Sequence, residues 1–106
     1  MRTAARCDIP LLVVVIDDGG YGAERYACAI SDRPTHLVDF DNPDYSGIAS
    51  AMGLESYRVS SLDELRDAFT AALPLTRPTL IQAIVDRDVY STELFRAQAN
   101  FRGREG

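Results

Sequence analysis

Lysine is absent from the 106-residue chain, and all eleven basic residues are arginine. Without lysine the chain can run no Schiff-base chemistry, offers no lysine general base and forms no Walker-type phosphate loop. Cysteine is scarce as well, since Cys7 and Cys28 are too few for a disulfide scaffold and lack metal-ligand spacing. Two unpaired cysteines are typical of a reducing compartment, so we expect a cytoplasmic protein.

Long hydrophobic runs and clustered positive charge are missing too. The longest apolar run, Ile9 to Ile16, contains Pro10 and is far shorter than the roughly 20 residues of a membrane span. No signal-type segment precedes it. The formal charge of −5 opposes phosphate binding through clustered cations. We therefore expect neither a membrane nor a nucleic acid as a partner.

Strand and helix patterns alternate along the chain. The unbroken apolar run over 11–16 predicts a strand buried on both faces. Residues 79–85 predict a second strand, and residues 57–59 are a shorter candidate. Helical patterns occupy 2–7, 23–30, 43–52, 61–73 and 92–99, while 36–40 reads as an extended connector. This alternation predicts an α/β fold with three layers, helix–sheet–helix, and a mostly parallel sheet.

Two helix starts carry specific capping signals. Asn42 is predicted to cap a helix whose first residue is Pro43, and Gly53 is predicted to end that helix. Ser61 to Glu64 forms a capping box, although Ser60 could also be the cap. The helix that follows is predicted to bury the apolar residues spaced at its helical period, namely Leu62, Leu65, Phe69 and Leu73.

The most informative segment is the acidic, glycine-rich turn Asp17 to Gly22, which follows the first apolar strand. In open parallel sheets, ligands bind beyond the carboxyl ends of strands, where glycines allow close backbone approach and helix N-termini favour anions. Paired carboxylates could hold a cation such as Mg²⁺. A tight turn with solvated aspartates explains the same residues. A response-regulator receiver also carries such an acidic pair, but its chemistry needs the lysine that this chain lacks.

At this turn the chain resembles a known family. Leu11 to Tyr26, LLVVVIDDGGYGAERY, is similar to the second half of the cofactor motif of thiamine-diphosphate-dependent enzymes of the acetolactate synthase and benzoylformate decarboxylase branch. Downstream, NPDYSGIASAMGLESYRVSSLDEL and PTLIQAIVD resemble the family's helix, short strand, capped helix and terminal strand. The resemblance covers about residues 4–86 and leaves 87–106 as a terminal helix and tail.

The resemblance implies a role for individual residues. The second member of the acidic pair, Asp18, would bind Mg²⁺ through its side chain, and Gly20 would bind it through its backbone carbonyl. Gly19, Gly20, Tyr21 and Gly22 would line the diphosphate of thiamine diphosphate. Glu24 and Ala27 fall where relatives place substrate-pocket side chains. The implied chemistry is decarboxylation or carboligation of 2-oxo acids, and no catalytic residue can be named in this chain.

Two departures from the family pattern matter. The pair is Asp-Asp and contains no asparagine, so Asp17 brings a second charge that must be hydrogen-bonded or solvated. The Gly-Asp-Gly segment that opens the family motif has no counterpart, so we expect an incomplete domain that is inactive alone. Its partner would be a complementing upstream polypeptide or further copies of the chain. The alternative is a non-enzymatic α/β binding or interaction module derived from the family.

The remaining polar residues have simpler interpretations. His36 and Cys28 are expected to be a solvated connector residue and a small packed residue. Asp86-Arg87-Asp88 is expected to be a solvated strand end.

Overall fold

A computed structural model describes residues 1–90, 93 and 96 of the chain. These residues form two compact units, Met1–Asp17 with Asn42–Val85, and Asp18–Asp41 with the described residues from Asp86 onward. The predicted helix 92–99 falls almost wholly outside the described residues. Among the described residues, no helix has the length and apolar character needed to cross a membrane.

The first unit is built on a parallel sheet, ordered β1-β3-β2 in the described part of the chain. β1 (Leu12–Asp17) pairs with β3 (Thr79–Ile84) in the register Val14↔Ile81, and β2 (Glu55–Val59) pairs with β3 on its other side. The central strand β3 is buried along almost its whole length. β1 departs from the predicted burial on both faces, because Val14 and Ile16 are 40% and 65% exposed.

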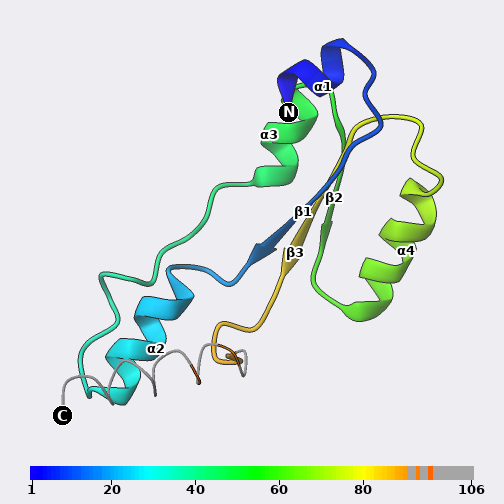
Figure 1. Ribbon diagram of the computed structural model, residues 1–106. Coiled ribbons are helices and arrows are strands. Elements are labelled where there is room, and N and C mark those ends of the chain that lie inside the picture. The colour runs from blue at the N-terminus through cyan, green and yellow to red at the C-terminus, as the bar shows by residue number, and fades with distance from the viewer. Residues whose placement is uncertain (91–92, 94–95, 97–106) are drawn as a thin grey trace. The chain divides into compact units, whose positions relative to one another are not determined.

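Helices cover the two faces of this sheet (Figure 1). α4 (Leu62–Ala72) packs on β2 and β3, where Ile81, Ala83, Val59 and Ala68 form one core cluster. The opposite face is covered by α3 (Tyr45–Ala51) and by α1 (Arg2–Arg6), with Ala49, Leu54 and Leu80 as the second cluster. The predicted three-layer α/β arrangement with a parallel sheet is confirmed.

The cap predicted for α3 is wrong. Asp44, and not Asn42, caps this helix, since its carboxylate accepts from the Gly47 N–H at 3.0 Å and from the Ser46 hydroxyl at 2.7 Å. These hydrogen bonds hold the pKa of Asp44 below its ordinary value. The other end agrees with the prediction, because Gly53 follows the last turn with φ +94°.

The buried face predicted for α4 is wrong at both of its ends. Leu62 is 75% exposed and Leu73 is also exposed, whereas Ala68 and Ala72 are buried beside the partly buried Leu65 and Phe69. The helix therefore contacts the sheet through Leu65 and Phe69, as predicted, together with the small residue Ala68. The capping box also differs: Ser61 accepts from the Glu64 N–H, but the Glu64 carboxylate accepts from the N–H of Ser60.

The second unit contains α2 (Gly22–Ile30) and the turns on either side of it. The helix begins one residue earlier than predicted. The segment 36–40 is mostly turn and not extended, with a single antiparallel bridge between Asp39 and Gly20. The Tyr21 N–H donates to the Val38 carbonyl at 2.9 Å, and the Phe40 N–H donates to the Gly19 carbonyl at 3.2 Å. The glycine turn is thereby fixed against the connector.

Candidate functional site

The two aspartates that follow the apolar strand have separate surroundings. Asp17 is 7% exposed and belongs to the first unit. Its carboxylate accepts from Gln82 Nε2 at 2.8 Å and from Asn42 Nδ2 at 2.6 Å. Gln82 also accepts from the Ser46 N–H at 3.1 Å, which connects the carboxylate to the start of α3. The second charge of the pair is therefore hydrogen-bonded inside the fold.

Asp18 is half-buried in the second unit, and the described residues give its carboxylate neither a hydrogen bond nor an ion pair. Its side chain folds back over the first residue of α2, because a Cβ at Gly22 would lie 2.2 Å from Asp18 Oδ2. Glycine at this position therefore gives the carboxylate room at the helix N-terminus. A negative group there lies next to the backbone N–H groups of the helix N-terminus, which favour negative charge.

The backbone of the turn is equally restricted at Gly20. Its φ is +156°, and a Cβ there would lie 2.2 Å from the Val38 carbonyl oxygen. Tyr21, the N-cap of α2, is 60% exposed and supplies no side-chain acceptor to the first N–H groups of the helix. Its ring packs edge-on against Phe40 at 4.8 Å between centroids. The helix start therefore presents N–H groups beside an exposed aromatic ring.

Arginine side chains hold this turn in place. Arg25 of α2 is 3% exposed and pairs with Asp39, while its Nη1 donates to the Arg87 carbonyl at 3.0 Å. Both Arg25 Nη2 and Arg87 Nη2 donate to the Gly19 carbonyl, each at 3.3 Å. A buried charge of this kind is tolerated because its donors are satisfied by a carboxylate and by carbonyls.

Asp39 is the counterion of this network. Its burial raises the pKa, but hydrogen bonds from Thr35 and Arg25 and the charges of Arg25 and Arg87 outweigh this effect and hold the pKa of Asp39 below its ordinary value. Sequence reasoning missed Arg25. Arg87 is exposed, as expected for the cluster 86–88, but its hydrogen bond to the Gly19 carbonyl was not predicted. The only indication in the sequence was the position of Arg25 in the first turn of the helix that follows the glycine turn.

The oxygen donors of the turn suit a divalent cation, although they are few. A carboxylate without a protein partner at Asp18 and a backbone carbonyl at Gly20 are ligand types that Mg²⁺ prefers. The described residues contain no group of three or more His, Cys, Asp or Glu side chains that could hold a metal ion. The turn therefore fits part of a magnesium–diphosphate site, and further ligands would have to come from the diphosphate and from other chain segments.

Comparison with known proteins decides the family. Residues 1–83 match the family described as thiamine pyrophosphate enzyme, C-terminal TPP binding domain. The chain belongs to this family. The thiamine pyrophosphate enzymes carry the cofactor also called thiamine diphosphate, so the resemblance of the glycine turn is confirmed at the level of the domain.

Individual relatives agree with the family match. The chain is 30% identical over 81 residues, 76% of its length, to benzoylformate decarboxylase of Pseudomonas aeruginosa. It is 25% identical over 87 residues, 81% of its length, to oxalyl-CoA decarboxylase of Escherichia coli K12. It is 23% identical over 88 residues, 83% of its length, to the putative thiamine pyrophosphate-containing protein YdaP of Bacillus subtilis. The match spans 15% of the length of each of these relatives.

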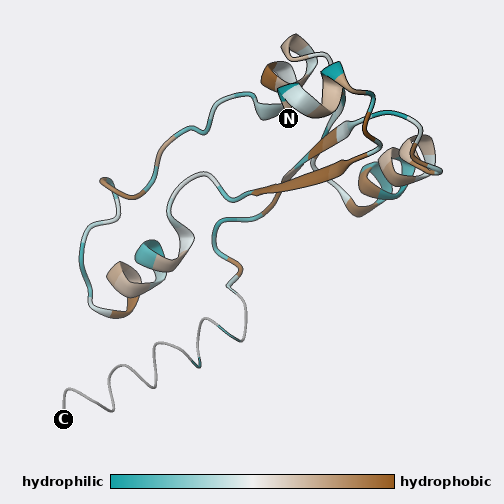
Figure 2. Ribbon diagram, turned by 45° about the horizontal axis from the view of Figure 1, so that its top comes forward, coloured by the Kyte–Doolittle hydropathy of each residue, from teal (hydrophilic) through white to brown (hydrophobic). Residues whose placement is uncertain are grey.

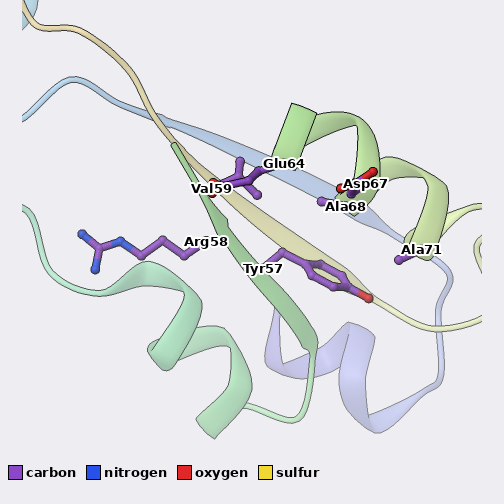
Figure 3. A pocket seen from close by; sticks show the side chains of 7 residues that line it. All are labelled: Tyr57, Arg58, Val59, Glu64, Asp67, Ala68 and Ala71. Carbon is purple, nitrogen blue, oxygen red and sulfur yellow. The ribbon is translucent and has the colours of Figure 1, made fainter. Parts of the chain in front are cut away.

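A hollow lies in the first unit, between β2 and α4 (Figure 3). Its volume is about 350 Å³, and its polar lining residues are Tyr57, Arg58, Glu64 and Asp67. Figure 3 shows the Arg58 side chain pointing away from α4. The hollow contains none of the predicted site residues.

Proposed function

We propose that this chain is the thiamine-pyrophosphate- and Mg²⁺-binding portion of an enzyme that decarboxylates 2-oxo acids or joins their carbon skeletons. The family match supports the cofactor, and the names of the relatives support decarboxylation as the reaction class. The observation that carries the assignment to residues is the Asp18 carboxylate, which lies against the N-terminus of α2 without a protein partner among the described residues.

In this proposal each residue of the turn either binds the metal ion and the diphosphate or holds the turn in position. Asp18 and the Gly20 carbonyl hold Mg²⁺, and the first N–H groups of α2 with Gly19, Tyr21 and Gly22 receive the diphosphate. Arg25 and Arg87 fix the Gly19 carbonyl, so that the next carbonyl in the chain keeps its direction. When bound, thiamine pyrophosphate supplies the electron sink for cleaving a bond beside a carbonyl group.

The remaining ligands are proposed to come from another polypeptide that carries the Gly-Asp-Gly half of the motif. The chain alone then binds the metal–cofactor pair weakly and does not turn over substrate. The alternative function, a non-enzymatic binding module, predicts no interaction of the turn with the cofactor at all. Weak binding at a defined turn therefore separates the two functions.

Paramagnetic broadening can detect such weak binding. We expect Mn²⁺ with thiamine pyrophosphate to broaden the amide signals of Gly19 to Gly22 in the ¹⁵N-labelled chain more than Mn²⁺ alone does. Asp18→Ala should abolish this difference, because alanine carries no oxygen that could bind the metal ion. Asp32→Asn controls for the loss of one negative charge, since Asp32 lies at the other end of α2 with φ +52°, which asparagine tolerates.

Three outcomes contradict the proposal. Uniform broadening without a cofactor effect supports the non-enzymatic module. Retained broadening in Asp18→Ala excludes the metal assignment. Binding at micromolar affinity by the chain alone excludes the idea that half of the ligands come from elsewhere.

A further inference from the structure

The chain forms a tight turn shortly after β3, at residues 86–89. The Val89 N–H donates to the Asp86 carbonyl at 3.3 Å, and the Asp88 N–H donates to the Asp86 carboxylate at 2.9 Å. Aspartate is a common first residue of such turns, because its carboxylate accepts from the backbone two residues on. Figure 2 shows the colour changing from hydrophobic along β3 to hydrophilic in the chain that follows it. The bonds of the 86–89 turn therefore fix the backbone at Arg87.

Arg87 joins this turn to the glycine turn through both its backbone and its side chain. Its carbonyl accepts from Arg25 Nη1 at 3.0 Å, and its own Nη2 donates to the Gly19 carbonyl at 3.3 Å. Its Nη1 lies 4.0 Å from the Asp39 carboxylate. The guanidinium packs closely on Gly19, where a Cβ would lie 2.5 Å from Nη2. Within the second unit, Arg87 therefore acts on the glycine turn twice, directly and through Arg25.

These bonds decide the direction of the Gly20 carbonyl. Two planar peptide groups meet at the Gly20 α-carbon, and glycine itself restrains neither of them. The first group is held at the Gly19 carbonyl, by the two arginines and by the Phe40 N–H. The second is held by the Tyr21 N–H, which donates to the Val38 carbonyl at 2.9 Å, so the Gly20 carbonyl points the opposite way. The described residues supply no donor to this carbonyl, which leaves its oxygen available to a cation.

We infer that the 86–89 turn is part of the proposed cofactor site and that Arg87 is its positioning residue. By holding the peptide group before Gly20, Arg87 sets the affinity of the site for Mg²⁺ with thiamine pyrophosphate. The bound pair in return stabilises the 86–89 turn, because coupling between two sites is reciprocal. This role rests on the proposed function, and it extends the site past residues 1–83, which match the family.

A second anchor keeps the segment in place when the Arg87 side chain is removed. The Tyr90 ring lies against the Tyr26 ring of α2, with 5.0 Å between the ring centroids. The backbone carbonyl that Arg25 uses is present whatever residue stands at position 87. Arg87→Ala therefore removes the direct contacts with Gly19 and Asp39 and leaves the other anchors of the segment in place.

Titration with Mn²⁺ and thiamine pyrophosphate measures the direct effect. We expect Arg87→Ala to raise the apparent dissociation constant, read from the broadening of the Gly19 to Gly22 amide signals, by about fivefold or more. Arg33→Ala is the matched control, because it removes the same charge from an exposed arginine of the second unit. It should change the constant by less than about twofold, since exposed charges are screened. Unchanged amide signals of α2 verify that the second unit stays folded.

Two substitutions of Asp86 separate positioning from charge. Asp86→Ala removes the acceptor that fixes the 86–89 turn and should weaken binding about two- to tenfold, the effect of one lost hydrogen bond. Asp86→Asn keeps an acceptor oxygen and should change binding by less than about twofold. If Arg87 acted only by attracting the negatively charged cofactor, both Asp86 variants would bind it more tightly than the unchanged chain.

The reverse effect is measured without any substitution. Mg²⁺ with thiamine pyrophosphate, at concentrations that saturate the glycine turn, should slow hydrogen exchange of the Val89 amide about fivefold or more, whereas Mg²⁺ alone should not. Unaltered Val89 exchange, unaltered affinity in Arg87→Ala, or tighter binding by Asp86→Ala overturns the role of Arg87 and leaves the proposed function intact. If the unchanged chain shows no cofactor-dependent broadening at all, the proposed function fails, and the role of Arg87 fails with it.

Discussion

Gln82 Nε2, at the centre of the sheet, donates to Asp17 Oδ2 at 2.8 Å. This bond joins the last residue of an edge strand to a side chain that is fully buried in the central strand. It explains how the chain tolerates an acidic pair at this position. The first carboxylate is a structural acceptor for two amides, and the second is left at the helix start.

Asp17→Asn is expected to destabilise the first unit. A carboxylate accepts from both Asn42 and Gln82, whereas an asparagine would turn its own NH₂ group toward one of these donors. Leaving a buried donor without an acceptor costs about 1–3 kcal/mol. Urea unfolding followed by circular dichroism measures the change. Asp86→Asn, at an exposed aspartate, is the control and should change the stability by less than about 0.5 kcal/mol.

Gly22→Ala is expected to weaken metal–cofactor binding without melting α2. The new Cβ would displace the Asp18 carboxylate, because it would lie 2.2 Å from Oδ2, while alanine itself favours the helix. Mn²⁺ with thiamine pyrophosphate should broaden the amide signals of the turn less in this variant than in the unchanged chain. If the effect passes through Asp18, then Gly22→Ala causes no further loss in the Asp18→Ala variant. An additional loss would mean that the alanine disturbs the diphosphate contacts themselves.

The Asp39 network is expected to open in acid. Its pKa is lowered in the folded chain, so the stabilisation is fully present above the ordinary carboxyl pKa of about 3.9 and is lost as the pH falls through the folded value. The NMR signal of the Arg25 Nε–H group should therefore stay constant from pH 7 to about pH 5 and shift only below about pH 4. A shift centred near pH 6 would contradict this assignment. Asp39→Asn should remove the transition.

Core substitutions test the corrected face of α4. Ile81 is fully buried in β3 beneath this helix, and Ile81→Ala should cost about 2–5 kcal/mol of unfolding free energy. Leu62→Ala should change it by less than about 0.5 kcal/mol, because Leu62 is exposed. A large loss for Leu62→Ala in urea unfolding would support the face that periodicity alone predicts.

Local signals in the sequence predicted most of the elements. The strands β1 and β3, the stop at Gly53 and the start of α4 at Ser61 depend on apolar patterns and on residues close in sequence. The errors have a different origin. Asn42 fits a cap by type, but its amide is used by Asp17, 25 residues away, and such pairing follows only from the strand register. The face of α4 was predicted correctly at Leu65 and Phe69, but the buried Ala68 and Ala72 give little hydrophobic signal.

The residues of the candidate site were proposed from the sequence and stay a prediction, whereas the contacts that support the turn were not predicted. Asp18, Gly20 and Gly22 stand out because an acidic glycine turn after a buried strand is unusual in composition and resembles a known motif. The arginines that hold the turn were missed. Arg25 and Arg87 are 62 residues apart, and no local pattern distinguishes a buried, fully bonded arginine from a solvated one.

The buried amide at Gln82 also bears on how the two strands find their alignment. Val13, Val14, Val15 and Ile16 are nearly interchangeable, so apolar packing alone would allow β1 to slide along β3. Only one alignment sets the Asp17 carboxylate beside Gln82 and Asn42, and any slip leaves a charge and two amides buried without each other. A single-residue insertion or deletion within β1 should therefore be far more damaging than any conservative exchange among its valines.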